Sequence, residues 1–161
     1  MTTLRSPAQL RASGLVTQER LASLEKVVDR YAVAIPDSLA QLIDRNDPRD
    51  PIARQFVPNI AELDYQMAED PDPIGDDAHS PVEGIVHRYP DRVLLKPTHV
   101  CAVYCRFCFR REMVGPGKAT ALSDSAYRDA LAYIRDHKDI WEVILTGGDP
   151  FMLSARRIGD V

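Results

Sequence analysis

The sequence predicts an α/β fold, in which a helical N-terminal region is followed by the first two β/α units of a partial barrel. Two short apolar stretches, 93–98 and 141–146, have the composition of buried strands. An amphipathic helix is expected between them, over 123–137, and another helix is expected to begin near Ser154. The order strand, helix, strand, helix is typical of a parallel sheet with right-handed crossovers.

The first 60 residues have the periodicity of helices rather than strands. We expect a short helix over 4–12, where a serine precedes a proline, and a longer one from 17 to about 33. Pro36 ends the longer helix, and shorter helices are expected over 38–43 and 51–56. This region is expected to provide helical packing rather than catalytic groups.

A stretch rich in proline, aspartate and glycine, residues 70–80, is expected to be a solvated linker. It marks the predicted domain boundary, with a helical region over 1–80 and the start of a barrel over 81–161. Because a new helix begins at the last residues of the sequence, we expect the chain to be the N-terminal fragment of a longer protein.

Composition excludes several classes of protein. A formal charge of −4 with no basic block argues against nucleic-acid binding. The first twenty residues have no apolar secretory core, and no apolar run reaches the ~18 residues of a membrane span. Unpaired cysteines without an export signal favour a cytoplasmic location.

All three cysteines of the sequence lie within eight residues, as Cys101, Cys105 and Cys108. A C-x3-C-x2-C set can hold three irons of a [4Fe–4S] cluster and leave one iron open for a small molecule. The main alternative is a structural zinc site completed by His99. A disulfide is disfavoured by the odd count.

Two further groups of residues are candidates for binding, an arginine pair and a glycine-rich turn. Arg88 and Arg92 flank a proline turn, and the guanidinium groups of arginines suit phosphate oxygens. A surface salt bridge with Asp91 or Glu83 is the simpler interpretation of this pair. A tight turn over 147–150 follows the second predicted strand, as the cysteines follow the first. In a barrel of β/α units, both loops would face the same mouth.

Together these segments resemble the lysine 2,3-aminomutase family of radical S-adenosylmethionine (radical SAM) enzymes. The resemblance rests on residues 87–92 (HRYPDR), the cysteine motif with the Phe109-Arg110-Arg111 that follows it, and residues 147–150 (GGDP). The stretches 35–39 and 75–81 are similar as well. The fold that the resemblance implies is a TIM-type radical SAM barrel.

The resemblance implies a role for each matching residue. The cysteines would bind the cluster, Phe107 would lie near it, and Arg110 would bind the substrate carboxylate. Arg88 and Arg92 would hold the phosphate of pyridoxal 5′-phosphate (PLP), which replaces the salt-bridge reading of that pair. The turn that would contact the amino group of S-adenosyl-L-methionine consists of Gly147, Gly148 and Asp149.

The implied function is an isomerase that moves an amino group from C2 to C3 of an amino acid. The favoured reaction is the conversion of L-lysine to L-β-lysine. The implied partners are a small-molecule substrate, an electron donor of flavodoxin or ferredoxin type, and further copies of the chain in a homo-oligomer. The lysine that would bind PLP has no match here, since Lys96 and Lys118 lie in other contexts. The fragment is therefore expected to be inactive alone. A β-lysine-forming enzyme for elongation factor P and a non-catalytic zinc-stabilised module are the alternatives.

Overall fold

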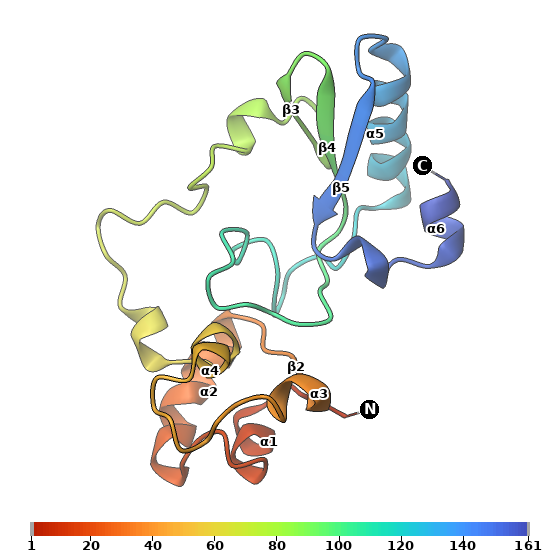
Figure 1. The fold of residues 1–161 in the computed structure, drawn as a ribbon. Helices are drawn as coiled ribbons and strands as arrows, with labels where there is room; N and C mark the ends of the chain where they lie inside the picture. The colour runs from red at the N-terminus through yellow and green to blue at the C-terminus, as the bar shows by residue number, and fades with distance from the viewer. Residues whose placement is uncertain (1, 161) are drawn as a thin grey trace. The chain divides into compact units, whose positions relative to one another are not determined.

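A computed structural model describes residues 2–160, which form two compact units (Figure 1). The first unit runs to Pro71 and also includes Ala102–Lys118. The second unit consists of Asp72–Cys101 and the chain from Ala119 onward. The cysteine motif thus crosses from one unit to the other, with Cys101 in the second.

The first unit is mainly helical, as expected, but its elements are shorter than the periodicity predicts. The expected long helix begins as a 3-10 turn and ends at Arg30, because the backbone of Tyr31 is extended, with φ −121° and ψ 130°. Two short strands that the sequence did not predict pair antiparallel with each other. The elements are β1 Thr3–Leu4, α1 Pro7–Ala12, η1 Gln18–Arg20, α2 Leu21–Arg30, β2 Ile35–Pro36, α3 Asp37–Ala40, α4 Pro51–Phe56 and η2 Ile60–Leu63.

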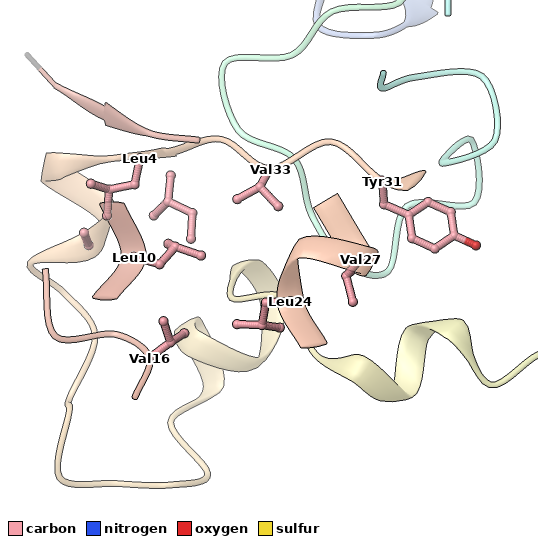
Figure 2. Close-up of a cluster of buried hydrophobic side chains, with 9 residues drawn as sticks. Leu4, Leu10, Val16, Leu24, Val27, Tyr31 and Val33 are labelled. Atoms are coloured by element: carbon pink, nitrogen blue, oxygen red, sulfur yellow. The ribbon is translucent and has the colours of Figure 1, made fainter. Parts of the chain in front are cut away.

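A cluster of buried apolar side chains forms the core of the first unit (Figure 2). Leu24 and Val27 contribute the buried face of α2, three residues apart as helical spacing requires. Leu10 comes from α1, and Leu4 and Ile35 come from the paired strands. Burial of each such side chain stabilises the fold by about 1.5–3 kcal/mol.

The second unit contains a three-stranded sheet in the order β3-β4-β5. The strands β4 and β5 are parallel and α5 lies between them in sequence, which confirms the expected β/α order. The strand β3 is antiparallel to β4 and was not predicted, and no closed barrel is present in residues 2–160. The elements are η3 Asp77–His79, β3 Ile85–Tyr89, β4 Arg92–Thr98, α5 Asp124–Asp136, β5 Glu142–Gly147, η4 Pro150–Met152 and α6 Ala155–Gly159.

The helix α5 covers one face of this sheet (Figure 1). Ile85, Val93 and Leu95 pack against Tyr127 and Ala130 of the helix. Side chains alternate between the two faces of a strand, so the neighbours of these residues lie on the opposite face. That opposite face carries both arginines predicted to bind phosphate.

In the part of the chain that the structure covers, no helix combines the length and apolar character needed to cross a membrane.

Candidate functional site

The turn after β5 packs against the end of β4. Gly147 pairs with Thr98, the N–H of Gly148 donates a hydrogen bond to the carbonyl of Thr98 at 2.7 Å, and that of Asp149 donates to the carbonyl of Val100 at 2.9 Å. Parallel neighbouring strands end at the same edge of a sheet, which explains the contact. The predicted turn therefore lies against the residues that lead directly into Cys101.

Only glycine fits at the start of this turn. Gly147 has a φ of +95°, and a Cβ atom there would lie 2.7 Å from the carbonyl oxygen of Thr98. A Cβ at Gly148 would collide with the backbone of Val100. The carboxylate of Asp149 accepts a hydrogen bond from the N–H of Phe151 at 3.0 Å and caps η4.

Cys105 and Cys108 form a turn of their own in the first unit. The N–H of Cys108 donates to the carbonyl of Cys105 at 3.4 Å. Burial and the adjacent Cys108 thiol raise the pKa of Cys105 above its usual value. All three cysteines are free thiols, which fits a metal-binding donor set better than a structural disulfide.

No three His, Cys, Asp or Glu side chains gather closely enough to hold a metal ion among residues 2–160. His99, which could complete a zinc site, has its Nδ1 atom 3.3 Å from the carbonyl oxygen of Ala119. The cluster and zinc readings of the cysteine motif therefore both stay predictions at this point.

Aromatic and basic residues next to the cysteines reach solvent. Phe107, predicted to lie near the cluster, is 73% exposed. The guanidinium of Arg110 lies over the ring of Phe109, 4.6 Å from its centroid. Arg110, the predicted carboxylate ligand, belongs to the first unit with these aromatic rings.

A nearly buried ion pair anchors the cysteine turn, and the sequence did not indicate it. Arg106 lies between the two cysteines of the turn, and its guanidinium binds the carboxylate of Glu62 at 2.5 Å. The two side chains are 7% and 12% exposed. Because 44 positions separate them, no local pattern of residues could have indicated the pairing.

In the second unit, Arg88 and Arg92 line the same pocket. The pocket has a volume of about 230 Å³ on the face of the sheet opposite α5. Apolar side chains of the sheet supply much of its wall, and the full lining is Ile74, Asp76, Val86, Arg88, Tyr89, Arg92, Val93, Leu94 and Ile144.

Each arginine has its own protein partners. The guanidinium of Arg88 donates to the carbonyls of Ile74 and Gly75, and it lies 3.9 Å from the carboxylate of Asp76. Arg92 pairs with Asp91 at 2.8 Å and with Glu142 at 3.4 Å. The salt bridge between Arg92 and Asp91, the alternative weighed from the sequence, is thus present, and Arg92 also lines the pocket.

The arginine partner and the sole tryptophan hold Asp91 as a carboxylate. The hydrogen bond from Arg92, then that from Trp141 Nε1 at 3.0 Å, lower the pKa of Asp91 well below its usual range. The same carboxylate raises the pKa of Arg92. Asp91 and Arg92 are therefore both charged at every physiological pH.

The prediction that residues 70–80 are a solvated linker is wrong at Asp76. This side chain is nearly buried, and its carboxylate lies 3.9 Å from both Lys96 Nζ and Arg88 Nη2. Asp72 accepts hydrogen bonds from the N–H groups of Asp76 and Asp77, and the latter bond lowers the pKa of Asp72 most. Asp76 therefore holds this acidic stretch against the sheet, because its partners Arg88 and Lys96 lie on β3 and β4.

Comparisons with known proteins agree with the motifs. No protein-family profile matches the chain. It is 38% identical over 139 residues to an L-lysine 2,3-aminomutase of Clostridium subterminale, which covers 86% of this chain and 33% of that protein. An L-lysine 2,3-aminomutase of Methanococcus maripaludis is 39% identical over 138 residues, 85% of this chain and 32% of that protein.

A glutamate 2,3-aminomutase of Clostridioides difficile is 34% identical over 138 residues, 86% of this chain and 32% of that protein. The chain spans about a third of the length of the curated relatives that it matches. The relatives are named for two different amino acids, but all are 2,3-aminomutases. By sequence, this chain resembles about a third of the length of lysine 2,3-aminomutases and of a glutamate 2,3-aminomutase.

Proposed function

We propose that this chain forms part of a radical SAM, PLP-dependent isomerase that moves an amino group from C2 to C3 of an amino acid. The observation that supports the proposal most strongly is the pocket shared by Arg88 and Arg92, on a sheet whose carboxyl edge carries the Gly147-Gly148-Asp149 turn. These segments are distant in sequence from each other and carry the family's motifs.

The cysteine motif is proposed to hold the [4Fe–4S] cluster. Three thiolates leave one iron without a protein ligand, and that position would accept S-adenosyl-L-methionine. Two observations are compatible with metal binding: Cys105 and Cys108 belong to one turn, and none of the three cysteines forms a disulfide. When bound, the cluster and S-adenosyl-L-methionine supply radical chemistry, and PLP carries the amino group during its migration.

The chain's own residues bind and orient these groups. Arg88 and Arg92 are proposed to hold the phosphate of PLP, where their forks offer bidentate hydrogen bonds to its oxygens. The apolar side of the pocket, with Leu94 and Ile144, would exclude water from the bound cofactor. The ammonium of Lys96 already forms an ion pair with the carboxylate of Asp76, which argues against Lys96 as the lysine that binds PLP.

The turn after β5 is proposed to receive the amino group of S-adenosyl-L-methionine. Carbonyl oxygens near Gly147 and the carboxylate of Asp149 are acceptors, and an ammonium has only donors. Phe107 is proposed to pack beside the cluster, and Arg110 to bind the substrate carboxylate. The exposure of Phe107 leaves it available for such a contact.

L-lysine is the proposed substrate, in line with the names of most relatives. The relative named for glutamate matches this stretch with similar identity, so the residues that select the side chain are expected to lie elsewhere. Formation of β-lysine for elongation factor P is the alternative within the same chemistry. An electron donor of flavodoxin or ferredoxin type, a homo-oligomer and a cytoplasmic location complete the proposal.

The 161-residue chain is proposed to be inactive alone. The second unit has three strands and no closed barrel in the part described, and Ile144 is 41% exposed on the face away from α5. Parallel strands need cover on both faces. The relatives are about three times as long as the stretch matched, which leaves ample length to supply that cover.

A chimaera tests the function. This chain replaces the matching stretch of the Clostridium subterminale relative, and the anaerobically reconstituted protein receives PLP, S-adenosyl-L-methionine, a reductant, and L-lysine or L-glutamate. We expect β-lysine from the chimaera, none from a Cys108→Ala version, and none from the chain alone. A chimaera that folds and binds iron yet makes no β-amino acid would contradict the proposed function. Turnover by the chain alone would contradict the proposal that the chain is inactive by itself.

A further inference from the structure

We propose that the ion pair between Arg106 and Glu62 is a positioning device for the iron–sulfur cluster. It fixes the turn of Cys105 and Cys108 on the helical first unit, so that both sulfur atoms are held in place before any metal arrives. The inference rests on the proposed function, since it takes these cysteines to be cluster ligands. Arg106 and Glu62 themselves touch neither metal nor substrate in this account.

The contacts of Arg106 are unusually complete. Its Nε atom donates to both carboxylate oxygens of Glu62, at 3.0 and 3.1 Å, and its Nη2 atom donates to one of them at 2.5 Å. Its Nη1 atom donates to the carbonyl of Ala32 at 2.7 Å. A fork bound on two sides has little freedom to rotate, so the backbone between the cysteines is fixed as well.

The backbone of the turn is tied to the same unit. The N–H of Arg106 donates to the carbonyl of Gln55 at 2.7 Å, and that of Tyr104 donates to the carbonyl of Ala34 at 3.3 Å. Downstream, Arg111 Nη2 donates to the carbonyl of Glu62 at 3.1 Å. Each of these bonds joins the cysteine loop to a residue of the helical region.

Glu62 is held in position from its other side. Its carboxylate accepts a hydrogen bond from the N–H of Asn59 at 2.9 Å, as part of the capping box that begins η2. The Asn59 side chain in turn accepts from the N–H of Ala61 at 3.0 Å. The carboxylate therefore has its place set by η2 independently of Arg106, which makes it a fixed anchor for the loop.

Burial makes the pairing obligatory. A charge removed from water needs a partner, and these two side chains are among the least exposed charged groups described in the first unit. Phe107, the next residue, is 73% exposed, and Cys105, the preceding one, is exposed. Arg106 thus anchors the turn inward while its neighbours stay accessible to an incoming cluster.

Groups that orient metal ligands typically affect metal affinity about 10- to 100-fold when they are changed. Glu62→Gln keeps the shape of the anchor and removes its charge. Arg106→Lys keeps the charge and removes the fork. Glu25→Gln, an exposed glutamate on α2 of the same unit, is the matched control.

The experiment measures three quantities on the wild-type protein and these variants: iron and sulfide bound after anaerobic reconstitution, the rate of iron loss to a chelator, and the thermal midpoint of the metal-free protein. We expect iron loss about 10- to 100-fold faster in Glu62→Gln and Arg106→Lys than in wild type and Glu25→Gln. The electron paramagnetic resonance spectrum of the reduced cluster should broaden in these two variants, which a purely structural ion pair would not cause.

Several results would overturn the inference. Wild-type iron retention in folded Glu62→Gln and Arg106→Lys proteins would leave the cluster proposal standing and refute the positioning role. No iron uptake by wild type would refute both. If Glu62→Gln fails to fold, Arg106→Lys decides, and loss of the metal-free fold in both variants would show that the pair serves folding rather than positioning.

Discussion

Arg88 on β3 and Arg92 on β4 line one pocket, although the chain turns back on itself between them. The hairpin register places Tyr89 opposite Arg92, so the two arginines emerge beside each other at the same end of the sheet. Arg88 is held by the carbonyls of Ile74 and Gly75, and Arg92 is held by Asp91. Two cations fixed at the edge of one cavity favour a phosphate.

The first prediction concerns this pair. Replacement of Arg88 by alanine should weaken binding of PLP by roughly 10- to 100-fold, since a hydrogen bond to a charged group is worth about 1.5–3 kcal/mol. Isothermal titration with PLP, and with pyridoxal as the ligand without phosphate, measures the effect. Arg128→Ala, an exposed arginine on α5, is the control. Equal affinity for PLP in wild type and Arg88→Ala would show that Arg88 only holds the loop at Ile74 and Gly75 and does not bind the phosphate.

A second prediction concerns Asp76, whose carboxylate lies 3.9 Å from both Lys96 and Arg88. Removal of one partner of a buried pair costs about 3–5 kcal/mol. Because the separations here are long, the expected loss for Asp76→Asn lies at the lower end, about 3 kcal/mol. Urea unfolding measures it. The double variant with Lys96→Met should recover part of the loss, because the buried ammonium that loses the Asp76 carboxylate is then removed as well. A double variant less stable than Asp76→Asn would argue against the pairing.

The third prediction is a pH dependence. Trp141, the sole tryptophan, donates to Asp91, whose pKa is held below the ordinary aspartate value by Arg92 and Trp141. A lowered folded-state pKa means that the carboxylate stabilises the fold above its unfolded pKa of about 3.9, and that this contribution is lost as the pH falls toward the lowered value. Tryptophan emission should therefore be constant from pH 7 to about 4. A transition centred at the ordinary value in wild type, absent in Asp91→Asn, would contradict the account.

The fourth prediction tests the turn after β5. Gly147→Ala should destabilise the protein by about 1–3 kcal/mol, because alanine tolerates a positive φ poorly and its Cβ would press on the carbonyl of Thr98. Gly117→Ala is the matched control, since Gly117 also has a positive φ, +72°, but has open space around it. Thermal unfolding of both variants separates steric contact from backbone strain. Equal losses in the two would show that the close approach at Gly147 contributes nothing.

The predictable part of the fold depended on local signals. Ser6, Asp50 and Ser123 each accept a hydrogen bond from the N–H three residues on, so the starts of α1, α4 and α5 could be read from the cap residue and the periodicity that follows. The apolar runs of β4 and β5 were equally clear, because both are flanked by residues that end strands.

The rest depended on contacts between distant segments. The strand β3 escaped prediction because Arg88 and Tyr89 are exposed and a proline follows, which resembles a loop. Asp76 resembled a solvated loop residue because its partner Lys96 lies on β4. Glu62 attracted no notice, since only the folded chain brings it to Arg106. The cysteine motif was visible at once, because its three cysteines lie within eight residues of one another in the sequence.

The cluster itself gives the most direct test of the account. The protein is purified and reconstituted anaerobically with iron and sulfide, and its iron, sulfide and zinc contents are measured alongside those of Cys101→Ala, Cys105→Ala and Cys108→Ala variants. We expect a brown wild-type protein with about four irons per chain and the loss of the cluster in each variant. One zinc per chain, with no uptake of iron under these conditions, would contradict the account and establish the zinc-stabilised alternative.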